Sequence, residues 1–223
     1  MGYEHKRLTI DASRRFGRQF YDRYYRNRRT RVVTHGEMAR RAALIAAFVR
    51  HGELRVRRIL DAGCGLGLMR AALLRRLPGA RYTGLEASPY LCDRYGWEQG
   101  SLATWSHSRP FDLVICYDVL QYLDTRDAAA AMRGLGRLCA GVLHFGALTT
   151  EDWREHCDRR RTDRNVHLRS ADWYFSRLRG DFVNAGSGMY VRRGAPFHLW
   201  ALERLPPASA RCRAGSRGRR NSS

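Results

Sequence analysis

Residues 59–70 read Ile-Leu-Asp-Ala-Gly-Cys-Gly-Leu-Gly-Leu-Met-Arg, and this stretch decides the fold. An apolar run ends on Asp61, a helical pattern begins after the stretch, and between them glycine occupies every second position, at Gly63, Gly65 and Gly67. Glycine reaches positive φ and has no Cβ, so a strand, a glycine turn and a helix N-terminus form a cradle for a polar adenosine-type ligand. A dinucleotide pyrophosphate loop requires a third glycine three residues after its second. Leu68 occupies that position, so the spacing disfavours NAD.

An acidic residue follows at the distance expected for ribose binding. Residues 80–86 predict a second short strand that ends on Glu86, 19 residues beyond Gly67. This matches the ~20-residue offset at which a carboxylate meets a ribose in such folds. Both ribose hydroxyls donate and an ionised carboxylate only accepts, so one side chain can bind both. Ser88 and Pro89 predict a helix that starts directly after this strand.

The pattern Asp-x-Gly-x-Gly-x-Gly resembles the first motif of the class I S-adenosylmethionine-dependent methyltransferases, and residues 61–67 fit it at each defined position. Residues 111–118 resemble the fourth strand of that family, with the continuous apolar core of a strand buried on both faces. Residues 97–102 lie where the family usually has an acidic residue that faces the adenine amine. This chain has Ser101 there, a weaker acceptor than a carboxylate.

The resemblance implies S-adenosylmethionine as the cofactor and methyl transfer as the reaction. The adenine would contact backbone groups of Ser101 and Leu102, and residues 116–118 would lie against the cofactor and the methyl acceptor. The cofactor-binding residues implied in this way are Asp61, Ala62, Gly63, Gly65, Glu86, Ala87, Ser101, Leu102 and Tyr117.

Strand and helix patterns alternate along the rest of the chain. Apolar strands are predicted near 56–61, 80–86, 111–117 and 141–148, and helices over 67–77 and 126–139, the latter capped by Thr125. This alternation predicts an α/β fold with a doubly wound, mostly parallel sheet. Residues 188–205 predict a β-hairpin around 193–196, and the resemblance makes that hairpin the antiparallel edge of a seven-stranded sheet.

The sequence and the resemblance together predict an N-terminal helical cap (1–51), a methyltransferase domain (52–205) and a basic tail (206–223). Residues 39–49 predict a packed helix. Before it, aromatic side chains at positions 16, 20, 21, 24 and 25 share one helical face, which favours a packing face. The alternative is a lid over the cofactor pocket, in which Tyr21, Tyr24 or Arg31 reaches the substrate or the methionine carboxylate.

The formal net charge is +20, and Lys6 is the only lysine among the 41 basic side chains. Arginine is spread along the chain, which indicates a composition bias more than a selected binding surface. Only the tail concentrates charge, so it could contact nucleic acid non-specifically through counterion release. The six cysteines and the histidines show no zinc spacing, so no metal is predicted. The absence of a signal peptide and of a membrane-spanning run predicts a cytoplasmic protein.

A sulfonium methyl is already activated, so the protein must mainly hold the acceptor in line and exclude water. An acceptor that carries a proton also needs a base. His144 and Asp118 are the candidates for that catalytic role, with Tyr117 beside them, although a core histidine is the commoner outcome. The sequence favours transfer to an oxygen or nitrogen of a small molecule. RNA or protein methylation, and a non-catalytic cofactor-binding scaffold of the same fold, stay open as alternatives.

Overall fold

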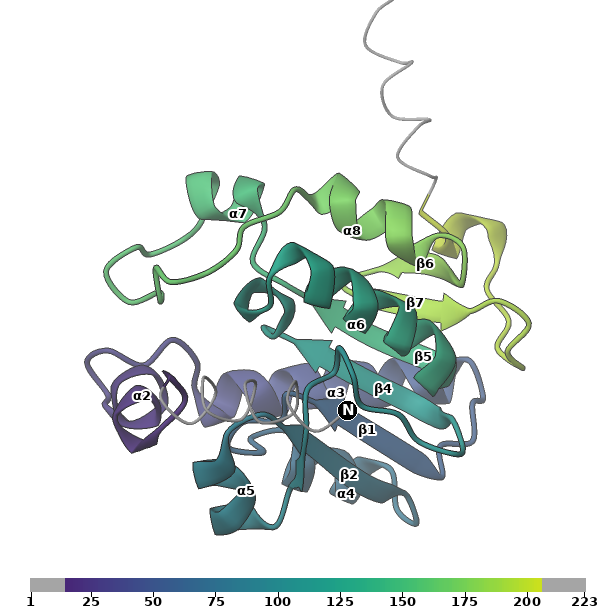
Figure 1. The fold of residues 1–223 in the computed structure, drawn as a ribbon. Coiled ribbons are helices and arrows are strands. Elements are labelled where there is room, and N and C mark those ends of the chain that lie inside the picture. The colour runs from purple at the N-terminus through teal and green to yellow at the C-terminus, as the bar shows by residue number, and fades with distance from the viewer. Residues whose placement is uncertain (1–14, 206–223) are drawn as a thin grey trace, which may run out of the picture.

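The protein is described from a computed structural model that covers residues 15–205. Seven strands form one sheet in the order β3-β2-β1-β4-β5-β7-β6 (Figure 1). Strands β1 to β5 pair in parallel, and β7 pairs antiparallel with both β5 and β6. The predicted doubly wound, mostly parallel seven-stranded sheet with an antiparallel edge is therefore confirmed.

The two central strands carry the longest apolar runs. In β4, Leu113 and Ile115 pack on one face of the sheet, while Val114 and Cys116 pack on the other. Successive side chains of a strand point to opposite faces, so a strand covered on both sides is apolar throughout. The strands are β1 (Arg58–Ala62), β2 (Arg81–Glu86), β3 (Glu98–Gln99), β4 (Phe111–Tyr117), β5 (Cys139–Gly146), β6 (Phe182–Gly186) and β7 (Met189–Arg192).

Helices cover both faces of the sheet. Helices α3 (His35–His51) and α4 (Arg70–Arg76) pack on one face, and α6 (Thr125–Leu138) and α8 (Ala171–Leu178) pack on the other. The short helix α5 (Pro89–Tyr95) contacts β2 and β3, and α7 (Thr150–Glu155) follows β5. The described part of the chain contains no helix with the length and apolar character needed to cross a membrane.

Helix caps follow the local chemistry of the sequence. The Ser88 hydroxyl accepts the Leu91 N–H and Pro89 opens α5, as predicted. At α6 the predicted cap, Thr125, is wrong. The Asp124 carboxylate accepts the Asp127 N–H at 2.8 Å, and Thr125 is the first helical residue. A carboxylate is favoured at this position because it also faces the positive end of the helix dipole.

The hairpin lies at residues 182–192 instead of within 188–205. Its turn is formed by Ser187 and Gly188, whose φ values are 49° and 74°. Positive φ at both turn residues matches the right-handed twist of the two strands. The segment after β7 contains Pro196, which cannot donate to a strand ladder. That segment ends in the short helix η3 (Ala201–Glu203).

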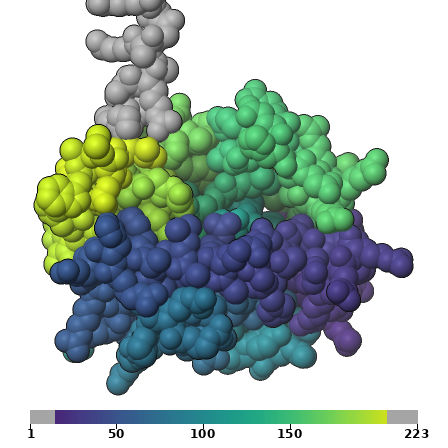
Figure 2. Space-filling view, turned by 180° about the vertical axis from the view of Figure 1, so that it is seen from behind, coloured from purple at the N-terminus to yellow at the C-terminus, as the bar shows by residue number. Residues whose placement is uncertain are grey.

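Aromatic residues before α3 form a short helix beside the carboxyl ends of the parallel strands. Helix α2 (Arg18–Tyr21) continues into a π-helical turn, η1 (Asp22–Arg26). Residues five apart share a face of a π-helix. The Tyr25 ring therefore lies on the same side of the segment as the Phe20 ring, with 6.3 Å between the ring centroids. Figure 2 shows this segment, in the deepest purple, at the right of the molecule and below the green segment that follows β5.

The predicted division of the chain into a cap, a methyltransferase domain and a tail stays a prediction. Helix α3, which belongs to the predicted cap, shares one core cluster with β1 and β4. The predicted boundary near residue 51 stays a prediction. The predicted basic tail, residues 206–223, lies outside the described residues.

Candidate active site

The glycine turn after β1 has three glycines with positive φ, but they serve different purposes. A Cβ on Gly63 would lie 2.3 Å from Val119, and one on Gly67 would lie 2.7 Å from the Trp97 ring. A Cβ on Gly65 would meet nothing within 4 Å. Packing therefore requires glycine at the first and third positions, while Gly65, with φ of 53°, faces open space.

Glu86, the last residue of β2, lies directly beside this turn. Its carboxylate accepts the Gly65 N–H and the Ser88 N–H, each at 2.9 Å. The side chain is 6% exposed. Burial raises the pKa of Glu86, while the two backbone N–H donors act in the opposite direction. Each carboxylate oxygen has two lone pairs, so the Oε2 atom, which accepts only the Gly65 N–H, can accept a further hydrogen bond.

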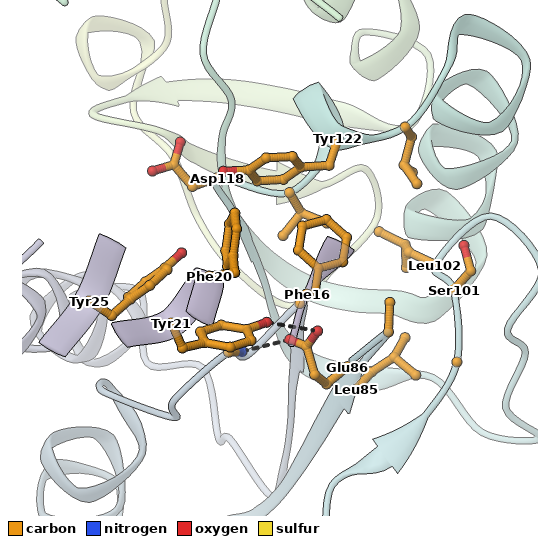
Figure 3. A pocket seen from close by; sticks show the side chains of 16 residues that line it. Phe16, Phe20, Tyr21, Tyr25, Leu85, Glu86, Ser101, Leu102, Asp118 and Tyr122 are labelled. Atoms are coloured by element: carbon orange, nitrogen blue, oxygen red, sulfur yellow. Dashed lines mark hydrogen bonds between the residues drawn. The ribbon is translucent and has the colours of Figure 1, made fainter. Parts of the chain in front are cut away.

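A cavity of about 680 Å³ that is open to solvent lies over Gly65 and Glu86 (Figure 3). The aromatic N-terminal helix forms one wall, and the Tyr21 hydroxyl lies 3.5 Å from the Glu86 carboxylate. Two further walls come from residues 100–102 and 118–123. The predicted site residues that line this cavity are Tyr21, Gly63, Gly65, Glu86, Ala87, Ser101, Leu102 and Asp118.

A second cavity of about 470 Å³, also open to solvent, shares Tyr25, Gly63, Gly65 and Asp118 with the first. Tyr117, Asp118 and Asp61 line it. Asp61 is buried and accepts a hydrogen bond from the Tyr82 hydroxyl at 2.6 Å. Burial raises the pKa of Asp61 to about 6. Ala62, another predicted cofactor residue, is fully buried in the core and lines neither cavity.

The residues around the two cavities fit a nucleoside cofactor. The Glu86 carboxylate offers acceptors for a pair of ribose hydroxyls, and the space over Gly65 is free of side chains. Leu102, 5% exposed, offers an apolar wall beyond Glu86. The Ser101 hydroxyl already accepts the Ala103 N–H at 3.3 Å, so it is partly engaged within the chain.

Asp118 follows β4 with φ of 62°, a left-handed conformation that is uncommon outside glycine and that aspartate tolerates better than most residues. Its N–H donates to the Gly146 carbonyl at 2.9 Å, which fixes the turn. The carboxylate accepts the Gln121 amide N–H at 3.0 Å, and burial raises the pKa of Asp118. Backbone strain of this kind concentrates at functional sites, which favours a role for Asp118.

His144, the other catalytic candidate, lies behind the cavities. It is 1% exposed and lines neither of them. Its Nε2 lies 3.4 Å from the Arg41 guanidinium, which also donates to the Tyr117 hydroxyl at 2.9 Å. Burial, together with the charge of Arg41, lowers the pKa of His144 to about 3. The ring is therefore neutral at pH 7 and contacts the site only through Tyr117 and Arg41.

Of the three N-terminal residues predicted to reach the substrate or cofactor, one lines a cavity and two do not. Tyr21 lines the larger cavity, whereas Tyr24 and Arg31 line neither. Sequence reasoning assigned no role in the site to Tyr122, and it favoured packing for Tyr25. Both line the larger cavity. The sequence feature that could have indicated a role for Tyr25 was its five-residue spacing from Phe20, because a π-helical turn places residues five apart on one face.

Comparisons with known proteins agree with this geometry. Residues 60–141 match the family model of a methyltransferase domain. Trans-aconitate 2-methyltransferase of Pseudomonas aeruginosa (strain UCBPP-PA14) is 31% identical over 156 residues, which cover 66% of this chain and 49% of that protein. Malonyl-[acyl-carrier protein] O-methyltransferase of Magnetococcus marinus is 31% identical over 111 residues, 44% of this chain and 40% of that protein. The chain thus spans at most about half the length of these curated relatives.

Solved structures share the fold. The N-methyltransferase NodS of Bradyrhizobium japonicum, in complex with S-adenosyl-L-homocysteine, has a TM-score of 0.57 at 18% identity, over 83% of this chain and 98% of that one. Magnesium protoporphyrin IX methyltransferase of Synechocystis has a TM-score of 0.56 at 18% identity, over 82% of this chain and 96% of that chain. Residues 60–141 thus match a methyltransferase domain, and the chain shares the Rossmann-like α/β fold of these solved methyltransferase structures.

Proposed function

We propose that the protein transfers a methyl group from S-adenosylmethionine to an oxygen or nitrogen of a small molecule. The observation that carries this proposal is the position of the Glu86 carboxylate, which accepts a hydrogen bond from the Gly65 N–H at the edge of the larger cavity. The space next to Gly65 is open, since a Cβ added there would meet no atom within 4 Å. One of the curated relatives is named for trans-aconitate, a small carboxylate, which supports a small-molecule acceptor for this chain.

The residues would divide the work between the two cavities. Glu86 would bind the ribose and Leu102 would contact the adenine, while Asp61 and the glycine turn would surround the methionine part. When bound, the cofactor supplies a sulfonium methyl that needs no further activation. Tyr117 and Asp118 would then lie on the acceptor side, where they hold the acceptor in line and keep water out.

Proton removal falls to Asp118 in this proposal. Asp118 lines both cavities, and burial raises its pKa, which makes its carboxylate a stronger base than that of an exposed aspartate. His144 would act as a positioning residue, since its neutral ring stacks on Tyr117 with 5.9 Å between centroids. Its low pKa, about 3, makes it a weak base.

Calorimetry tests the cofactor first. We expect S-adenosylhomocysteine to bind and NAD not to bind. Radiolabelled S-adenosylmethionine is then incubated with the protein and a metabolite extract, with and without nuclease and protease treatment. Label in small molecules that survives both treatments supports the proposal. Label that disappears with nuclease or protease identifies an RNA or protein acceptor, and binding without any labelled product identifies a scaffold.

A further inference from the structure

The charge of the two cavities is opposite to that of the chain. The sequence carries a net charge of +20, yet no arginine, lysine or histidine among residues 15–205 lines either cavity. Three carboxylates do: Asp61, Glu86 and Asp118. In a chain with arginine distributed throughout, this exclusion of cations indicates that the ligands themselves are cationic or are hydrogen-bond donors.

Two of the three carboxylates are already engaged at the glycine turn. Glu86 holds the Gly65 N–H, and Asp61 accepts the Tyr82 hydroxyl. Asp118 lines both cavities and has one side-chain hydrogen-bond partner in the described chain, the neutral amide of Gln121. No arginine or histidine of residues 15–205 lies within 4.0 Å of the Asp118 carboxylate.

Other charged groups surround Asp118 at longer range. Glu37 and Asp152 raise its pKa through their negative charge, and Arg41 lowers it. The Arg41 guanidinium lies over the Tyr117 ring at 3.8 Å and donates to its hydroxyl, so this cation is held outside the cavities. The Asp118 carboxylate therefore offers a negative charge to whatever enters the site from the acceptor side.

Aromatic rings stand around the same carboxylate. Tyr25 and Tyr122 line the larger cavity with Asp118, and the charge of Asp118 contributes to raising the pKa of both hydroxyls (Figure 3). Phe20 lies between the two tyrosines, with its ring centroid 6.2 Å from that of Tyr122. The Tyr122 ring already holds one cation, because the Arg15 guanidinium lies 4.9 Å from its centroid. A carboxylate combined with aromatic faces is the arrangement that binds ammonium groups.

We infer that the methyl acceptor is an amine, held as its ammonium form by Asp118 and the faces of Tyr25 and Tyr122. This inference rests on the proposed function and names its substrate class. A carboxylate acceptor would meet like charge at Asp118 with no cation in either cavity to offset it.

The same groups account for the reaction of such an acceptor. The ammonium gives one proton to the Asp118 carboxylate, which leaves a lone pair on nitrogen. That lone pair forms the new N–C bond while the S–C bond of the sulfonium breaks and its electron pair stays on sulfur. The methylated ammonium carries the positive charge, and the proton on Asp118 passes to water.

Probe binding tests the inference separately from turnover. The full chain, saturated with S-adenosylhomocysteine, is titrated at pH 8 with benzylamine, benzyl alcohol and benzoate by equilibrium dialysis. Benzylamine should bind at least tenfold more tightly than either of the others. Asp118→Asn should weaken benzylamine binding about tenfold, since it removes a charge-assisted hydrogen bond. Asparagine tolerates the left-handed backbone, so this variant keeps the turn.

The matched control is Asp93→Asn, at an exposed position on α5. It should bind benzylamine as the unmodified protein does. A metabolite extract provides a second measurement that needs no variant. Acetylating its amines should abolish incorporation of labelled methyl groups, whereas amidating its carboxylates should leave incorporation intact.

The inference is overturned if benzoate or benzyl alcohol binds as tightly as benzylamine, if benzylamine does not bind, or if acetylation leaves the label in place. Failure of the protein to bind S-adenosylhomocysteine would be a different result. It would refute the proposed function itself, and it is measured before any acceptor probe is added.

Discussion

The two ends of the site are built in different ways. At the glycine turn, the chain presents backbone N–H groups and two carboxylates, Asp61 and Glu86, within residues 61–88, a continuous piece of sequence. At the acceptor end, Tyr25, Asp118 and Tyr122 come from a π-helical turn, a strand end and a short helix. The first end depends on local backbone conformation, and the second depends on packing between distant segments. Variants at the two ends should therefore separate cofactor binding from acceptor binding.

Glu86→Gln should produce the largest effect. The amide loses the charge that strengthens hydrogen bonds from two ribose hydroxyls, each worth ~1.5–3 kcal/mol. We expect the affinity for S-adenosylhomocysteine to fall about 100-fold in calorimetry. Glu98→Gln, on the exposed strand β3, is the control and should bind normally. An unchanged affinity in Glu86→Gln would contradict the role of this carboxylate.

Asp61→Asn should change the free energy of unfolding, in contrast to the change in ligand affinity expected for Glu86→Gln. The folded-state pKa of Asp61 is about 6, above its ordinary value, so its carboxyl stabilises the fold fully below about pH 4 and this contribution is lost as pH rises through 6. Asparagine carries no charge and can still accept the Tyr82 hydroxyl. The variant should therefore gain up to about 2–3 kcal/mol over the unmodified protein at pH 8 and little at pH 4. Urea unfolding at both pH values measures this, and equal gains would contradict it.

Gly65→Asn probes the open space over the turn. Asparagine adopts positive φ and no atom lies within 4 Å of the added Cβ, so the fold should survive. The side chain would occupy space assigned to the cofactor, and the affinity for S-adenosylhomocysteine should fall about tenfold. Gly79→Asn is a matched control, because Gly79 also has positive φ and no neighbour within 4 Å. Equal affinities in the two variants would show that Gly65 does not face the ligand.

Tyr21→Phe should have the smallest effect. The Tyr21 hydroxyl lies 3.5 Å from the Glu86 carboxylate, a distance at which a hydrogen bond is weak. Removing it frees an acceptor on Glu86, so calorimetry should show an affinity for S-adenosylhomocysteine that rises by less than about threefold. A large loss of affinity would instead identify this hydroxyl as a direct ligand contact.

The sequence predicted the local geometry of the glycine turn more completely than the arrangement of residues around Asp118, for physical reasons. Glycine spacing, the strand-end Glu86 and the Ser88 cap are local features, and each has the predicted backbone geometry. The hairpin was misplaced because two positive-φ residues at 187 and 188 define its turn, and only one of them is a glycine. The sequence around His144 did not indicate that Tyr117 and Arg41 separate this side chain from the cavities. The contacts responsible join three segments that are distant in the sequence.

Trp97 gives the glycine turn its own optical reporter. The indole ring lies under Gly67 and Gly84, and its N–H donates to the Gly65 carbonyl at 3.0 Å. A ligand seated on Gly65 perturbs that carbonyl, and the emission of the indole bonded to it shifts in response. Occupancy of the turn can therefore be followed by fluorescence without a label, and Trp97→Phe should abolish the signal while the other four tryptophans remain.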